Sequence, residues 1–539
     1  MKIYFKLMTV LAVTLLTSIT SAQDVVLTGS QVPATATEFG QVRGYVHNEI
    51  TTYKGIPYAQ AKRFEAAVSP TKWEGVKSTT MFGPVAPLLT PTTSIQDESE
   101  FVFDHDWGFP NEDCLSLNVW TPEASNNKMR PVLFWIHGGG FTAGSSHELP
   151  SYDGENLAKK GDVVVVSINH RLNVLGFLDL SSYGEKYQHS ANNSILDMVK
   201  ALEWVKNNIA NFGGDPNNVT IFGQSGGGAK VNTLMAMPKA KGLFHKAINQ
   251  SGAFRSAMLE KEDTQDIAKE TIAILGLDGS TIDSIQNIPF DVLADASTKA
   301  LGKVAEKMKA AGKPVIGFGL SWGPSRDGID LPYQVNSKEA LALSKDIPLM
   351  IGTAKNEFAP FANMRFVGAS EEVIMKHIKD TYKDNADAYI KAAKKAYPND
   401  TDPKDLLDID TMFRPGAVVQ ANEKSAIEGG ASVYMFIFTW QSPVFDGKYK
   451  ALHCMELPFV FDNINLANQM TGGGQEAHVL AEKMSGAWIN FAKTGNPNYK
   501  NLPEWPKYNS SNTATMHFDV TCEVKPQLDK ELFEIVNGQ

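Results

Sequence analysis

The sequence has few cysteines and, after its first residues, no long uncharged apolar run. Cys114, Cys454 and Cys522 are its only cysteines in 539 residues. This excludes a scaffold held by many disulfides, and an odd number leaves at least one thiol unpaired within an exported chain. Stability must come from a hydrophobic core, and no later segment is apolar enough to predict a membrane-spanning helix.

The sequence also lacks an excess of basic residues, internal repeats and low-complexity linkers. The chain has 50 Lys and Arg against 60 Asp and Glu, a formal net charge of -10. This balance gives no general reason to bind nucleic acid or an anionic membrane, so we predict neither partner. A hydrophobic fraction of 43% and a charged fraction of 20% are ordinary for a globular chain and exclude wholesale disorder.

The N-terminus has the pattern of a secretory signal peptide. Lys2 and Lys6 precede an apolar stretch at 7–16, and Thr20 and Ala22 are small residues that suit cleavage after residue 22. We predict that residues 1–22 are removed and that the protein is secreted or periplasmic. A membrane anchor is the alternative, but the apolar stretch is short for ~30 Å of hydrocarbon.

The middle of the chain alternates between strand-like and helix-like segments. Residues 131–136 and 162–168 are continuous apolar runs, as in strands buried on both faces of a sheet. Residues 195–209 repeat apolar side chains at helical spacing, and a further strand-like run follows at 218–222. This order predicts an α/β fold with a mostly parallel, doubly wound sheet.

Two long regions read instead as amphipathic helices. They span about 255–345, including helices at 262–275 and 297–311, and about 370–430. No linker composition separates them from the rest of the chain. We therefore predict one catalytic domain at 23–539 with helical insertions over the sheet.

A serine lies between glycines directly after a predicted strand. Residues 223–227 read Gly-Gln-Ser-Gly-Gly, and a helix-like stretch follows at 229–237. A sharp strand-to-helix turn lifts such a serine above the sheet, and the helix N-terminus favours a developing negative charge. The context favours Ser225 as a nucleophile over an ordinary serine in a glycine-rich loop.

A second glycine run follows another strand. His137 precedes three glycines at 138–140, which present backbone N–H groups without obstructing side chains. Such groups can stabilise an oxyanion. The alternatives are a flexible turn or a phosphate-binding loop, and the latter lacks the usual Gly-Lys-Ser/Thr.

A serine nucleophile needs a base and an acid later in the chain. His453 lies in a loop before an apolar stretch, whereas His377, His478 and His517 lie in patterns typical of surface or packing residues. Two acids remain open. Glu357 follows the strand-like run at 347–351, and Asp327 stands in an Asp-Gly pair that more often marks a turn.

An ordered series of motifs resembles the type B carboxylesterase family, the carboxylesterase and cholinesterase group of α/β-hydrolases. The resemblance covers Gly40 to about Pro506 and is carried by residues 53–59, 112–120, 134–141, 169–172, 213–216, 222–227 and 453–461. It implies a catalytic triad of Ser225, Glu357 and His453, and so favours Glu357 over Asp327.

The resemblance also implies an oxyanion hole formed by the N–H groups of Gly139, Gly140 and Gly226, and a reaction without metal or cofactor. The predicted function is hydrolysis of a small carboxylic ester through an acyl-serine. Gly252, Ala253 and Phe254 are candidates for the acyl pocket. A lipase, a polyester hydrolase or an amidase would share the mechanism, and a non-catalytic cholinesterase-like binding protein is the alternative of another class. The oligomeric state is not predicted.

The sequence departs from the family pattern at four positions. Gly226 replaces the usual Ala after the serine, and Gln224 replaces a frequent Glu before it. Cys114 lacks its usual upstream partner, because residues 82–87 contain no cysteine. Cys454 beside His453 is unusual, and a buried inert thiol is its favoured interpretation.

Overall fold

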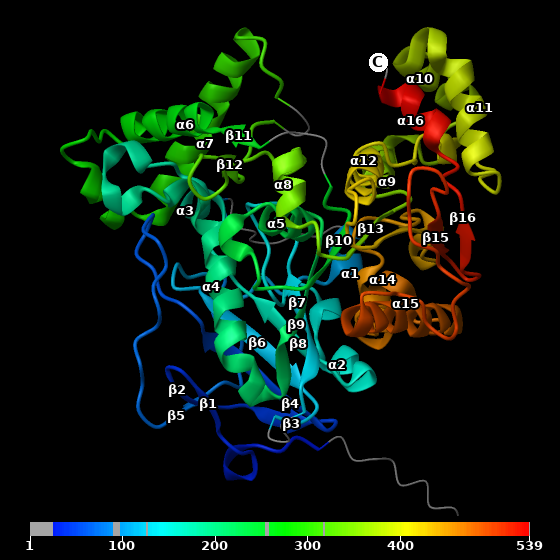
Figure 1. Ribbon diagram of the computed structural model, residues 1–539. Coiled ribbons are helices and arrows are strands. Elements are labelled where there is room, and N and C mark those ends of the chain that lie inside the picture. The colour runs from blue at the N-terminus through cyan, green and yellow to red at the C-terminus, as the bar shows by residue number, and fades with distance from the viewer. Residues whose placement is uncertain (1–24, 90–97, 125–127, 254–257, 316–318, 538–539) are drawn as a thin grey trace, which may run out of the picture.

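A computed structural model describes residues 25–89, 98–124, 128–253, 258–315 and 319–537 (Figure 1). The predicted signal peptide at 1–22 lies outside these ranges. Within them, no helix combines the length and the apolar character needed to cross a bilayer.

The core of the molecule is a sheet of 11 strands in the order β16-β15-β14-β13-β10-β9-β7-β8-β6-β4-β3. The strands from β8 through β15 in this order pair in parallel, and the pairs at both edges are antiparallel. The predicted fold class is therefore confirmed. The strands are β3 (Tyr45–His47), β4 (Ile50–Pro57), β6 (Ser116–Thr121), β7 (Arg130–Ile136), β8 (Val164–Ile168), β9 (Gly214–Gln224), β10 (Lys246–Gln250), β13 (Leu349–Ala354), β14 (Val433–Phe438), β15 (Thr515–Phe518) and β16 (Glu523–Lys525).

The sheet is covered on both faces, which explains its uninterrupted apolar runs. Phe134 of β7 packs in one hydrophobic cluster with helices α4 (Asn193–Asn208) and α5 (Gly226–Met235). Its neighbour Trp135 packs in a second cluster with α15 (Gln475–Thr494). Because successive strand residues point to opposite faces, the side chains at 132–136 of β7 enter the two cores alternately.

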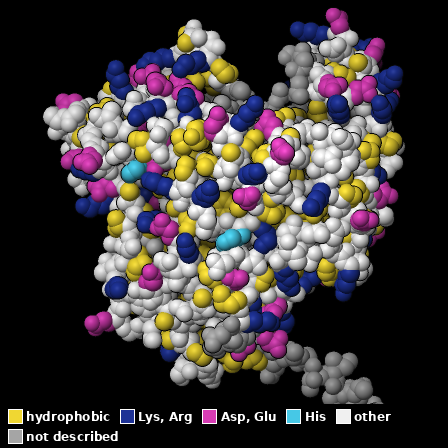
Figure 2. Space-filling model, viewed as in Figure 1, with side chains coloured by type: hydrophobic (Ala, Val, Ile, Leu, Met, Phe, Trp, Pro, Cys, Tyr) yellow, Lys and Arg dark blue, Asp and Glu magenta, His cyan; other side chains and the backbone are white. Residues whose placement is uncertain are grey.

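Further helices extend beyond the sheet. The regions predicted to hold helical insertions contain α6 (Lys261–Ile274), α7 (Phe290–Ala310) and α8 (Lys338–Leu343), and then α10 (Glu371–Tyr382), α11 (Ala386–Ala396) and α12 (Arg414–Ser425). In Figure 1, α6 and α7 lie at one upper side, and α10 and α11 lie with the C-terminal α16 (Lys530–Asn537) at the other. Figure 2 shows a notch between these two parts and charges of both signs interspersed over this face.

The remaining elements are short. They are α1 (Glu98–Phe103), α2 (Glu155–Gly161), α3 (Asn173–Phe177), α9 (Ala359–Ala362), α13 (Leu457–Val460) and α14 (Asn468–Thr471), with strands β1 (Thr35–Thr37), β2 (Gly40–Arg43), β5 (Val76–Ser78), β11 (Leu259–Glu260) and β12 (Ser325–Arg326).

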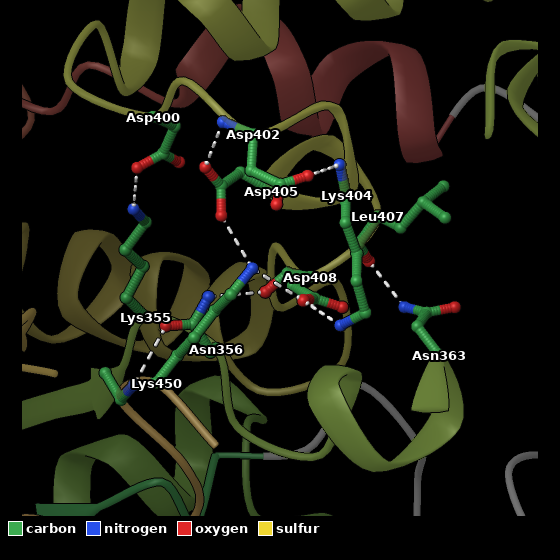
Figure 3. Close-up of polar contacts among 11 residues, drawn as sticks. Lys355, Asn356, Asn363, Asp400, Asp402, Lys404, Asp405, Leu407, Asp408 and Lys450 are labelled. Atoms are coloured by element: carbon green, nitrogen blue, oxygen red, sulfur yellow. Dashed lines mark hydrogen bonds and ion pairs between the residues drawn. The ribbon is translucent and has the colours of Figure 1, made fainter. Parts of the chain in front are cut away.

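A buried cluster of ion pairs joins the second insertion to two loops at the end of the sheet (Figure 3). Lys355 follows β13 and pairs with Asp400 at 2.5 Å. Lys450 follows β14 along the chain and donates to Asp405 at 2.6 Å and to Asp408 at 2.7 Å. The segment at 400–408 therefore binds both loops. We call Lys355, Lys450, Asp400, Asp405 and Asp408 the lysine–aspartate clamp.

Asn356 completes the clamp between the same two loops. Its side-chain amide donates to the Asp408 carbonyl at 2.7 Å, and its oxygen accepts from the Ala451 N–H at 3.1 Å. The Asp408 side chain is fully buried and also accepts from Lys404. Removing one partner of a buried ion pair leaves an uncompensated charge, which is costly.

We predict that Asp408→Ala destabilises the protein by ~3–5 kcal/mol, because Lys404 and Lys450 lose a shared buried carboxylate. Urea unfolding measures the shift in midpoint. The matched control is Asp380→Ala, which breaks an exposed pair with Lys376 and should cost less than ~1 kcal/mol. Equal midpoints for the two variants would contradict the structural importance of the clamp.

Candidate active site

Ser225 occupies a sharp bend between β9 and α5. Its backbone has φ 56° and ψ -125°, a conformation that L-residues rarely adopt. The neighbouring glycines are required for space: a β-carbon on Gly223 would lie 2.7 Å from the Ile136 carbonyl oxygen, and one on Gly227 would lie 2.0 Å from it. The sequence pattern thus produces the strained strand-to-helix turn that it predicted.

The glycine loop after β7 lies against this bend. Gly139 and Gly140 have φ of 78° and 62°, and a β-carbon on Gly139 would lie 2.4 Å from the Ala143 carbonyl oxygen. A β-carbon on Gly226 would lie 2.2 Å from the Gly140 carbonyl oxygen. The structure therefore brings the predicted oxyanion residues Gly140 and Gly226 into direct backbone contact, and it leaves no room for a methyl group at position 226.

Glu357 and His453 form a buried pair. Glu357 Oε2 accepts a hydrogen bond from His453 Nδ1. Its other oxygen accepts from the Ser251 hydroxyl at 2.5 Å and from the Ala354 N–H at 2.7 Å. These bonds fix the carboxylate, and the carboxylate fixes the imidazole with its proton on Nδ1, so that the lone pair is on Nε2.

Two aromatic rings exclude water from the imidazole. Phe358 lies 4.1 Å and Phe413 5.1 Å from the His453 ring, measured between centroids. Burial lowers the pKa of His453 to about 4, so the ring is a neutral base near pH 7. Burial also pushes the pKa of Glu357 upward, and the hydrogen bonds from Ser251 and Ala354 oppose this shift by favouring the carboxylate.

Gln224 connects the bend to this pair. Its side-chain nitrogen lies 3.3 Å from His453 Nε2, and its oxygen accepts from the Cys454 thiol at 3.2 Å. In the described part of the chain, the Ser225 hydroxyl itself makes no hydrogen bond to the ring. The residue directly before Ser225 thus contacts the ring. Catalytic hydrogen bonds are often long without substrate and tighten only when it binds.

In the described part of the chain, the competing acid and histidines make no hydrogen bond, ion pair or ring contact with Ser225 or with the Glu357–His453 pair. Asp327 Oδ1 accepts from the backbone N–H groups of Ile329, Asp330 and Leu331, all at 2.9 Å, and so stabilises its own turn. His377, His478 and His517 lie on α10, α15 and β15. The three cysteines are free, and burial raises the pKa of the Cys454 thiol well above its usual range, as expected of an unreactive thiol.

Sequence reasoning missed several residues around the pair. Ser251 directly precedes Gly252 and Phe358 directly follows Glu357, but nothing in the local pattern reveals what they contact. Glu456 is fully enclosed, accepts from Gln250 at 3.1 Å, and has its pKa raised to about 7 by burial. It supplies a buried carboxyl near the position where Gln224 replaces the family's Glu. Among the described residues, no group of three or more His, Cys, Asp or Glu is arranged to hold a metal ion.

A cavity of about 470 Å³ lies between α5 and the first insertion. Its walls include Phe141 after the glycine loop, Ala229 of α5, and Gly252, one of the residues predicted to line the acyl pocket. Met308, Leu320 and Trp322 contribute much of the remaining apolar wall. Ala253 is not among the lining residues of this cavity, and Phe254, the third candidate, lies outside the described residues. The cavity suits the apolar part of a small ligand.

The sequence is similar to those of known esterases. The model of the carboxylesterase family matches residues 31–535. The chain is 35% identical to the para-nitrobenzyl esterase of Bacillus subtilis over 512 residues, which covers 92% of this chain and 96% of that protein. It is 32% identical over 547 residues to carboxylesterase 1E of Rattus norvegicus, covering 93% of each.

Solved structures give the same result. An esterase from Clostridium hathewayi, described as able to hydrolyse aliphatic aromatic polyesters, has a TM-score of 0.82 and 36% identity and covers 94% of this chain and 98% of its own. A Geobacillus stearothermophilus carboxylesterase has a TM-score of 0.71 and 35% identity, with 91% and 97% covered. The sheet is thus that of an α/β-hydrolase, and the chain belongs to the carboxylesterase family, whose members are carboxylic ester hydrolases.

Proposed function

We propose that this carboxylesterase acts through an acyl-enzyme on Ser225, with His453 as the base and Glu357 as its orienting acid. The observation that supports the proposal most directly is the buried Glu357–His453 hydrogen bond. It leaves Nε2 of a neutral imidazole beside a strained serine turn. This is the arrangement that activates a serine hydroxyl.

In the first half of the reaction, His453 Nε2 takes the proton of Ser225 as Oγ bonds to the ester carbonyl carbon. The carbonyl oxygen becomes an oxyanion, which the N–H groups of Gly139, Gly140 and Gly226 stabilise. The carbon–alkoxy bond breaks, and the leaving alcohol receives the proton from His453. Water then repeats the sequence on the acyl-serine, releasing the carboxylic acid and restoring the serine.

A polyester is a second candidate substrate. The Clostridium hathewayi esterase has the highest TM-score of the solved structures compared above, 0.82, and is described as hydrolysing aliphatic aromatic polyesters. The cavity between α5 and the first insertion has an apolar wall with aromatic members, Phe141 and Trp322. An aromatic acyl group would pack against such rings.

We also propose that the protein is exported after removal of residues 1–22. The basic start, apolar stretch and small residues before Gln23 support this location. Mass spectrometry of the protein expressed in its host checks the proposal, and a mature chain that retains residues 1–22 would refute it.

The mechanism predicts that Ser225→Ala abolishes hydrolysis of a p-nitrophenyl ester and of an aliphatic aromatic polyester, with a loss of ~10⁴-fold or more in kcat. The variant should fold, since alanine is smaller than serine. A fluorophosphonate should label the wild type and not the variant. Residual wild-type turnover in the variant would refute Ser225 as the nucleophile, and an unlabelled wild type would favour the non-catalytic binding protein.

The pH profile should report the depressed pKa of His453. A base whose pKa is lowered stays neutral to lower pH, so kcat/KM should remain constant as pH falls through 6.5 and decline only below it. Phe358→Leu, which removes an aromatic ring from the imidazole, should move the acid limb upward. A wild-type midpoint at or above pH 6.5 would contradict the burial of the base.

Gly226→Ala should reduce kcat/KM by ~10-fold or more, because a methyl group 2.2 Å from the Gly140 carbonyl must displace a donor of the oxyanion hole. The control is Gly302→Ala in α7, where nothing lies within 4 Å of an added β-carbon. That change should leave turnover unchanged and stabilise the helix slightly. Full activity of Gly226→Ala would show that the loop accommodates the methyl group.

A further inference from the structure

Lys230 of α5 lies under the glycine loop and is fully buried. Its ammonium donates to the carbonyl oxygen of His137 at 3.0 Å and to that of Gly138 at 3.4 Å. In the part of the chain that the structure describes, these are its only hydrogen bonds, and no carboxylate forms an ion pair with it. A buried cation is expensive unless it is paired, so its direction toward two peptide carbonyls calls for an explanation.

The Gly138 carbonyl and the Gly139 N–H belong to one peptide group. A trans peptide is planar, and its C=O and N–H point in opposite directions. A donor that holds the Gly138 oxygen on the α5 side therefore turns the Gly139 N–H away from α5. Gly138 lies next to the nucleophile, since a β-carbon built on it would be 3.5 Å from Ser225 Cβ.

We propose that Lys230 is a positioning residue for catalysis, whose ammonium anchors and polarises the Gly138–Gly139 peptide so that the Gly139 N–H is a stronger donor to the oxyanion. The inference rests on the proposed function of Ser225 and its oxyanion hole. A hydrogen bond from a cation to a peptide oxygen draws electron density from the nitrogen, which strengthens the N–H as a donor in a low-dielectric site.

Two further contacts hold the same loop. His137 Nδ1 donates to the Gly138 oxygen at 3.0 Å, so this carbonyl receives two donors. The Lys230 ammonium also lies 5.9 Å from the centre of the Phe141 ring, at the other end of the loop. Lys230 therefore lies against both ends of the loop, with the His137 carbonyl at its start and the Phe141 ring at its end.

Burial lowers the pKa of Lys230 to about 7, and the carboxylate of Glu148 opposes this shift from beyond contact distance.

Lys424 provides a matched control within the chain. It is also buried, lies on α12, and donates to the carbonyls of Ser344 and Lys345. The loop that it contacts, at 344–345, carries none of the residues proposed for catalysis. Lys230→Met and Lys424→Met remove the same chemical group from similar surroundings, so a difference in turnover between them isolates the effect of position.

The experiment compares the two variants on p-nitrophenyl butyrate and with a trifluoromethyl ketone, which forms an oxyanion on the serine. Lys230→Met should lower kcat by ~10–100-fold, less than the loss of a whole oxyanion donor, with KM changed by less than about threefold. Affinity for the ketone should fall by the same factor as kcat/KM. Lys424→Met should leave kcat and ketone affinity at wild-type values. Lys230→Gln, which keeps an uncharged donor, should be intermediate.

A folded Lys230→Met enzyme with wild-type kcat, or one in which only KM changes, would overturn the inference. Ser225→Ala is measured beside it: if that variant stays active, the proposed function fails, and if it is inactive while Lys230→Met is not, only the inference fails. Should the Lys230 variants not fold, a crystal structure of the wild-type phosphonate adduct decides. The phosphoryl oxygen should lie within hydrogen-bond distance of the Gly139 nitrogen with Lys230 on the Gly138 carbonyl, and a Gly138 carbonyl turned away from Lys230 would overturn the proposal.

Discussion

The site depends on backbone packed against backbone where β7 and β9 end. The two strands pair in parallel, with Ile136 opposite Gly223, so the turn that follows β9 must pass over the end of β7. Only residues without side chains fit there, as the 2.0 Å approach of a β-carbon on Gly227 to the Ile136 oxygen shows. This contact sets the serine turn and the glycine loop in one rigid unit, because any shift of one would force the other to move.

Burial then determines the electrostatics of that unit. Glu357, His453 and Lys230 are all enclosed, where charges interact more strongly than in water and where an unmatched charge is costly. The charged forms of Glu357 and Lys230 are stabilised by dipoles already in place: the Ser251 hydroxyl and Ala354 N–H for the carboxylate, and loop carbonyls for the ammonium. Such an environment needs little reorganisation when charge develops on a substrate.

Local pattern predicted the parts of the fold that local interactions determine. The strands at 131–136 and 218–222 were found because both of their faces are apolar, and the glycines because a tight turn needs them. Helix α7 begins at Phe290, directly after Pro289, which is earlier than the predicted start at 297. The fold class was predicted from the order of strand-like and helix-like segments along the chain, and the family from the order of its motifs.

Residues defined by tertiary contacts were beyond local pattern. Glu357 and Asp327 each follow a strand-like or turn-like segment, and only the fold shows that Asp327 is engaged by the N–H groups of its own turn. Lys230 reads as an ordinary polar residue of a helix, since its partners at 137 and 138 belong to another element. The same holds for Phe413, whose contact with His453 depends on the position of a whole insertion.

The second insertion, at about 370–430, is part of the site rather than a cover over it. The lysine–aspartate clamp binds the loops before Glu357 and His453 to the segment at 400–408, and the Asp410 N–H donates to the Lys355 carbonyl at 3.0 Å. The chain then reaches Phe413, which helps to desolvate the imidazole. A change in the insertion that moves Phe413 or the segment at 400–408 should therefore also alter the position of the Glu357–His453 pair or the burial of its imidazole.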